Sequence, residues 1–239
     1  MSFQESNSGK SWQNKTWVQL LAIAIAILPY LIAFFFPTYS YTVNIKVTLT
    51  HILIWSLIVF VILLLQRYLV GERFRDLNFK PGTWWKDILS GIALAALTLA
   101  ILFLTSSPIS SLFPAQKELH LGFAYREVFQ SPWLFALWLG PGILISSGIG
   151  EELLRTFVLT RLWKISSLPA WKLLTVFLYA GLFGLGHIYL GPDGVIQAAI
   201  YGCVIGFYYL RFGRVTVMII AHYLHFAFQF VLMYIWANP

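Results

Sequence analysis

The chain has 239 residues, of which 59% are hydrophobic and only 10% are charged, and this leaves too little polar surface to cover a soluble globule. Its formal net charge of +7 does not indicate a nucleic-acid partner, because the basic residues are scattered over short connectors rather than gathered into a stripe. The sequence therefore predicts an all-α, polytopic membrane protein, and its single cysteine, Cys203, excludes an intramolecular disulfide.

Apolar runs long enough to cross a bilayer follow a polar N-terminal tail, residues 1–16. We expect a membrane helix bundle of about seven transmembrane helices in a single domain, residues 17–239, with turn and breaker residues in the connectors. The expected spans are Trp17–Phe36, Val47–Leu65, Ile88–Leu104, Pro132–Trp163, Trp171–Tyr189, Val195–Leu210 and Val215–Trp236.

Lysine and arginine are concentrated in alternate connectors between these spans. If the spans alternate in direction, twelve of these cations, Arg161 and Lys164 among them, fall on one side and three on the other. The positive-inside rule then predicts a cytoplasmic N-terminus and an external C-terminus. The basic and aromatic segment from Arg67 to Lys86 is expected to lie along the inner headgroup layer.

The fourth apolar run is too long for one straight crossing. About thirty residues at 1.5 Å per residue exceed a hydrocarbon core of roughly 30 Å. Gly140-Pro141-Gly142 is the expected break, because Pro141 removes a helical hydrogen bond. Pro132–Leu139 is then expected to form a separate interfacial piece.

Two adjacent glutamates stand inside this fourth run. Of nine acidic residues, only Glu151 and Glu152 lie well within an apolar run, where an ionisable side chain faces the bundle interior and often marks a functional site. Arg155 follows one helical turn later and can pair well with only one of them, for which we expect Glu152. Glu151 is then available as a general base. The alternative is an ion pair that only ties helices together.

Histidines follow in the later runs. His187 ends the fifth span in Phe183-Gly184-Leu185-Gly186-His187, where Gly181, Gly184 and Gly186 leave a surface thin enough for another helix to approach. His222 and His225 share one face of the seventh span. Such a pair can bind a metal, donate to an oxyanion or hydrogen-bond between helices. Straight helices would leave His187 and His222 at different depths, so tilt or a deeper start of the fifth helix is needed to bring them together.

Three motifs occur in order along the chain: Glu-Glu followed by Arg, Phe-x-x-x-His, and a histidine near the start of the last span. This ordered set resembles the CPBP family of intramembrane proteases, which includes the type II CAAX prenyl endopeptidases and the bacterial Abi or bacteriocin-processing proteins. The family-like catalytic core covers about residues 142–229. We therefore expect an integral protein of a prokaryotic cell membrane. The resemblance implies that Glu151 and His187 activate water. It also implies that Glu152 and Arg155 support the site and that His222 helps to stabilise the oxyanion.

The chain departs from the family pattern at two places. Arg155 comes one position early for Glu-Glu-x-x-x-Arg, and Thr156 stands where the arginine is usual, which leaves open which glutamate is the base. The last motif usually has Asn or Asp four residues after its histidine, where this chain has Phe226. His225 lies on the same helix face, and we expect it to serve as the second oxyanion donor.

The resulting hypothesis is an intramembrane endopeptidase that hydrolyses a peptide bond with water activated by glutamate and histidine. Its expected partners are a peptide or protein substrate, membrane-bound or lipidated, and the lipid bilayer. The chain has no His-Glu-x-x-His, which excludes a standard zinc protease site. The expected cofactor is either none or a divalent metal such as zinc, and the candidate ligands are Glu151, His187, His222 and His225.

Two other functions fit the same residues. The first is a catalytically inactive family member that binds another membrane protein as a regulatory scaffold. The second is a transporter with a proton relay, which ranks lower because the sequence has no inverted-repeat pattern.

Overall fold

The computed structural model describes residues 15–35, 42–77, 79, 84–113 and 125–237. The predicted N-terminal tail lies almost wholly outside this part of the chain, and residues 78 and 80–83 of the predicted interfacial segment Arg67–Lys86 also lie outside it. The ordered elements described are helices of several kinds, and no strand occurs among these residues. In chain order they are α1 (Thr16–Phe35), α2 (Ile45–Leu64), η1 (Leu65–Leu69), η2 (Phe74–Leu77), α3 (Trp84–Ser111), α5 (Arg126–Gln130), α6 (Pro132–Leu137), η4 (Trp138–Gly142), η5 (Leu144–Glu151), α7 (Glu152–Ile165), α8 (Pro169–Leu185), η6 (Ile188–Leu190), α9 (Gly191–Phe212) and α10 (Val215–Ala237).

The predicted all-α membrane bundle is confirmed. Among the described residues, five helical stretches are long and apolar enough to cross a bilayer: Ile45–Leu69, Trp84–Ser111, Pro132–Ile165, Ile188–Phe212 and Val215–Ala237. Two further apolar stretches, Thr16–Leu28 of α1 and the whole of α8, are shorter. At 1.5 Å per residue α8 reaches only about 26 Å, less than a hydrocarbon core of about 30 Å. Seven crossings therefore stay a prediction.

The fourth apolar run is not interrupted at Pro141, so the expectation of a separate piece Pro132–Leu139 is wrong. Residues Pro132–Ile165 form one helical stretch of 34 residues, and Pro141 lies inside the π-helical segment η4. The wider π turns shift the hydrogen-bond pattern by one residue, so the missing N–H of Pro141 does not end the helix.

Small residues bring α8 and α9 close together. A Cβ added at Gly184 would lie 2.6 Å from the carbonyl oxygen of Val195, and one at Gly202 would lie 3.1 Å from Cα of Ala180. Gly181, which was expected to serve the same purpose, has nothing within 4 Å of such an atom. This close contact holds the two helices that border the site.

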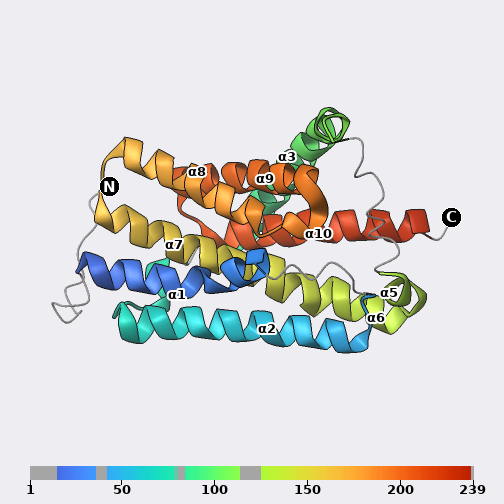
Figure 1. The fold of residues 1–239 in the computed structure, drawn as a ribbon, viewed down its shortest axis with the longest axis horizontal. Helices are drawn as coiled ribbons and strands as arrows, with labels where there is room; N and C mark the ends of the chain where they lie inside the picture. Colours follow the sequence, from blue (N-terminus) through green and yellow to red (C-terminus); the bar gives the residue numbers. More distant parts are fainter. Residues whose placement is uncertain (1–14, 36–41, 78, 80–83, 114–124, 238–239) are drawn as a thin grey trace.

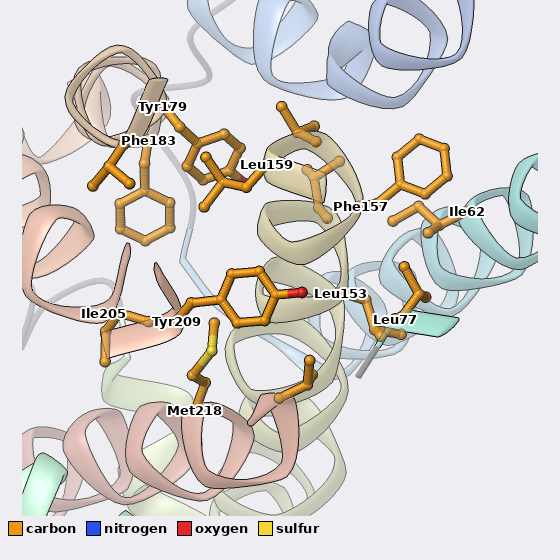
Figure 2. Packing of buried hydrophobic residues seen from close by; sticks show 14 of the residues in the cluster. Ile62, Leu77, Leu153, Phe157, Leu159, Tyr179, Phe183, Ile205, Tyr209 and Met218 are labelled. Carbon is orange, nitrogen blue, oxygen red and sulfur yellow. The ribbon is translucent and has the colours of Figure 1, made fainter. Parts of the chain in front are cut away.

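The helices form layers around α7 (Figure 1). α1 and α2 run alongside α7 on one side, α8 and α9 pack against each other on the other, and α10 crosses between α9 and α3. Figure 2 shows the core where these layers meet, with Tyr209 of α9 beside Met218 of α10 and with Phe157 of α7 on the side of Ile62 of α2. Since α7 is buried along most of its length, the charges that it carries lie inside the bundle.

Candidate active site

The two glutamates lie at the point where a π-helix becomes an α-helix. Glu151 is the last residue of η5 and Glu152 is the first of α7. Both side chains are buried, as is that of Arg155. π-helical segments of this kind are frequent at functional sites, because the extra residue in the turn changes where the neighbouring side chains point.

Arg155 pairs with Glu152, as the spacing predicted. Its Nε lies 3.1 Å from Oε2 of Glu152, and its Nη1 donates to the carbonyl oxygen of Gly202 on α9 at 2.9 Å. The guanidinium group also lies 4.6 Å from the ring centre of Phe183 on α8. Arg155 therefore joins α7 to both α8 and α9, and a buried cation in this position offsets the charge of one carboxylate.

His222 of α10 lies between the two glutamates. Its Nδ1 is 2.6 Å from Oε1 of Glu152, a hydrogen bond, and its Nε2 is 3.4 Å from Oε2 of Glu151. Since an ionised carboxylate can only accept, Nδ1 donates to Glu152. We name Glu151, Glu152, Arg155 and His222 the site cluster.

His187 lies near the site cluster but makes no hydrogen bond to the carboxylates of Glu151 and Glu152. Its Nδ1 donates to the carbonyl oxygen of Phe183 at 2.8 Å, and no hydrogen bond or ion pair joins it to either glutamate within the described residues. The ring of Phe183 lies 4.7 Å from that of His187 and 6.1 Å from that of His222, centre to centre. The two histidines, expected at different depths, therefore flank one phenylalanine. α8 ends earlier than predicted, so His187 lies just after the helix instead of within its last turn.

Two residues that the sequence analysis did not select also belong to this region. Tyr201 of α9 packs between the two histidines of α10, with its ring centre 4.6 Å from His222 and 4.8 Å from His225. Thr98 of α3 contacts Nδ1 of His225 through its hydroxyl at 2.9 Å. Both lie inside apolar runs, and nothing in the local pattern distinguishes them from ordinary core residues.

A cavity of about 80 Å³ lies between α3, the end of α8, α9 and α10. Thr98, His187, Tyr201, His225 and Phe226 are among the residues that line it. None of the four residues of the site cluster lines it in the described part of the chain. Tyr201 therefore stands between this cavity and His222.

The proposed metal ligands do not gather around one point. Among the described residues, no group of three or more His, Cys, Asp or Glu side chains is arranged to hold a metal ion. His225 instead bonds to Thr98, and His187 to a backbone carbonyl. The arrangement does not fit a metal centre built from Glu151, His187, His222 and His225.

A second group of charges lies near the other end of α7, around one buried arginine. Arg161 is buried in the helix, and its Nη2 lies 2.5 Å from Oε2 of Glu72. Lys164 also pairs with Glu72, and Nε2 of Gln66 donates to the same carboxylate at 3.0 Å. The predicted span Pro132–Trp163 included Arg161, but its partner Glu72 inside the protein was not predicted, and the side of the membrane on which Arg161 lies stays a prediction.

The comparison with known families agrees with these motifs. Residues 131–228 match the family model described as type II CAAX prenyl endopeptidase Rce1-like. No curated protein and no solved structure gives a significant match to the chain. The matched segment contains the whole site cluster together with His187 and His225, and the family resemblance predicted from the motifs is confirmed.

Proposed function

We propose that this chain, whose residues 131–228 are Rce1-like by sequence, is an intramembrane endopeptidase in which Glu151 activates water to hydrolyse a peptide bond. The match to type II CAAX prenyl endopeptidases supports protease activity of this class, on a peptide or protein substrate in the lipid bilayer. The assignment of roles rests on one observation, the placement of His222 between Glu151 and the Glu152–Arg155 pair.

The two glutamates have different partners, and this difference supports different roles. Glu152 contacts two side chains, with its Oε2 3.1 Å from Nε of Arg155 and its Oε1 2.6 Å from Nδ1 of His222. Oε2 of Glu151 lies 3.4 Å from Nε2 of His222, longer than an ordinary hydrogen bond. A carboxylate whose oxygen is not committed to a bond can accept a proton from water, whereas Glu152 serves to hold His222.

In the proposed reaction, Glu151 takes a proton from a water molecule as the water oxygen attacks the carbonyl carbon of the peptide. His222 then donates from Nε2 to the resulting oxyanion, while its Nδ1 stays on Glu152. When the carbon–nitrogen bond breaks, Glu151 returns the proton to the leaving amine. His187 assists in orienting the water, as the family resemblance implies, and reaches the carboxylate through that water because it makes no direct bond to it.

A catalytically silent scaffold is the second candidate, and a specific observation favours it. Glu152, Arg155 and His222 are completely buried and none of them lines the cavity. A network of this kind can simply hold α7, α9 and α10 together. The protein would then bind another membrane protein through its helices without cleaving it.

The test is hydrolysis by purified protein in proteoliposomes. A reporter peptide with a C-terminal prenylated cysteine motif and the same peptide without the prenyl group are incubated with the protein, and the fragments are identified by mass spectrometry. We expect cleavage at one peptide bond, with the prenylated peptide preferred. Glu151→Gln should reduce turnover by about 10² to 10⁴ fold, the usual contribution of a general base.

Glu127→Gln is the matched control, because it makes the same chemical change at an exposed glutamate of α5. Its turnover should equal that of the unaltered chain. Equal turnover by Glu151→Gln would eliminate the proposed role of Glu151. A folded unaltered chain that cleaves neither peptide would favour the scaffold.

A further inference from the structure

His225 makes one side-chain hydrogen bond, to a residue on a different helix. Its Nδ1 lies 2.9 Å from the hydroxyl oxygen of Thr98 on α3. The same hydroxyl lies 2.9 Å from the carbonyl oxygen of Ala95, one turn earlier on α3. Both Thr98 and His225 are buried and line the cavity.

The direction of the bond follows from counting hydrogens. A threonine hydroxyl carries one hydrogen, and a carbonyl oxygen can only accept. The hydrogen of Thr98 is therefore donated to Ala95, and the hydroxyl oxygen accepts from the ring nitrogen. This assigns the proton of a neutral His225 to Nδ1, from the hydrogen-bond network.

The chain contains the same arrangement at a place where the direction is not in doubt. Thr175 of α8 donates to the carbonyl oxygen of Lys172 at 2.9 Å, three residues earlier, and its hydroxyl lies 3.0 Å from Nε1 of Trp163. An indole nitrogen is only a donor. A buried threonine that donates to its own helix and accepts from a ring N–H is therefore an arrangement that this fold uses twice.

The other ring nitrogen of His225 is Nε2, and the His225 ring lines the cavity. Nε2 makes no hydrogen bond to the described part of the chain. In the Nδ1–H form Nε2 carries a lone pair and no proton, so a neutral His225 accepts there and does not donate. A volume of about 80 Å³ holds several water molecules, since one needs roughly 10–15 Å³.

We infer that Thr98 is a positioning residue, which holds His225 in its Nδ1–H form so that Nε2 accepts a hydrogen bond from a water molecule in the cavity. This replaces the expectation that His225 is a second oxyanion donor. The inference rests on the proposed function for its catalytic meaning, because an ordered water beside the site contributes to hydrolysis. The protonation of the ring does not depend on that function and can be measured separately.

The first readout is ¹⁵N NMR of histidine-labelled protein in detergent micelles at neutral pH. The chain has five histidines, and loss of one signal in His225→Gln identifies that of His225. We expect a proton on Nδ1 and none on Nε2. Thr98→Val should move the proton to Nε2 in part or in full, whereas Thr98→Ser should retain the original form.

Thr175→Val is the matched control, because it removes an equivalent hydroxyl acceptor from a different ring N–H and lies outside the cavity. It should leave the His225 signal unchanged. A proton on Nε2 of His225 in the unaltered chain would overturn the inference, as would a signal that Thr98→Val does not alter. The unaltered chain alone is decisive if Thr98→Val does not fold.

The second readout is turnover on the prenylated reporter peptide. Thr98→Val should lower kcat by about tenfold with little change in KM, which is the scale of one net hydrogen bond, and Thr98→Ser should restore most of it. Thr175→Val should leave kcat unchanged. A chain with the expected ring protonation but no hydrolysis would remove the proposed function and leave the tautomer assignment intact. Unchanged kcat in Thr98→Val would remove the positioning role.

Discussion

Two groups of charges lie at the two ends of helix α7, and they differ in composition and in burial. The site cluster at its N-terminal end has two carboxylates, one arginine and one histidine, Glu151, Glu152, Arg155 and His222. The group near its C-terminal end, which we name the α7-end cluster, has one carboxylate, Glu72, shared by Arg161, Lys164 and Gln66. A buried arginine on an apolar helix therefore does not by itself identify an active site.

The site cluster differs in having a second carboxylate, Glu151, in addition to Glu152, which pairs with Arg155. In the α7-end cluster the cations outnumber the carboxylate, and none of its members is a histidine. In the site cluster, Glu151 remains after Glu152 has paired with Arg155, and its Oε2 lies 3.4 Å from a ring nitrogen of His222. In the proposed function this second carboxylate is the general base, and the predictions below test that difference.

The largest effect is expected for Arg155→Met. It leaves Glu152 buried beside Glu151 without the cation, and breaking a buried pair in this way costs about 3–5 kcal/mol. Arg161→Met should cost less, about 1–2 kcal/mol, because Glu72 keeps Lys164 and Gln66 as partners. Denaturant unfolding of both variants in detergent micelles measures the difference. Equal losses would mean that the two clusters are equivalent, contrary to the comparison.

A smaller effect on stability is expected for Glu72→Gln. The free energy of unfolding should fall by about 2–3 kcal/mol, since Arg161 loses its carboxylate while the half-exposed Lys164 can turn to water. Turnover per folded molecule should not change, because the α7-end cluster holds the η1 region to α7 and does no chemistry. A parallel loss of turnover would show that this cluster also shapes the site.

The smallest effect is expected at the ion pair between α3 and the start of α10. Asp87 accepts two hydrogen bonds from Arg214, each 2.7 Å long, and these bonds raise the pKa of Arg214 above its usual value. Arg214 is 29% exposed, so Asp87→Asn should cost only about 1 kcal/mol. The loss should shrink at high salt, because exposed charges are screened. A salt-independent loss of several kcal/mol would place this pair among the buried clusters.

Much of the bundle could be predicted because hydrophobic length is a local property of the sequence. The expected span Val215–Trp236 differs from α10 by one residue. α3 runs from Trp84 to Ser111, well beyond the expected Ile88–Leu104. The expected span covered only the apolar run, whereas the helix also includes polar residues at both ends and Pro108. The number of crossings and the orientation of the termini stay predictions, since they depend on how the bilayer meets these helices.

The site could be predicted only where it depends on contacts within one helix. The pairing of Arg155 with Glu152 follows from their spacing of three residues on α7. The bond between Glu152 and His222 joins residues 70 positions apart, and that between Thr98 and His225 spans 127. Both depend on how α3, α7 and α10 cross. The pairing of Arg161 with Glu72 could not be predicted for the same reason, because the two residues are 89 positions apart.

The most direct test of the account compares Glu151→Gln with Glu152→Gln, the same change at adjacent positions. Turnover per folded molecule and free energy of unfolding are measured for both in the same lipid. The account predicts that Glu151→Gln folds normally and loses about 10² to 10⁴ fold in turnover. Glu152→Gln should lose about 3–5 kcal/mol of stability, because Arg155 and His222 lose their charged partner. Full turnover by Glu151→Gln, or an unfolded Glu151→Gln beside a stable Glu152→Gln, would contradict it.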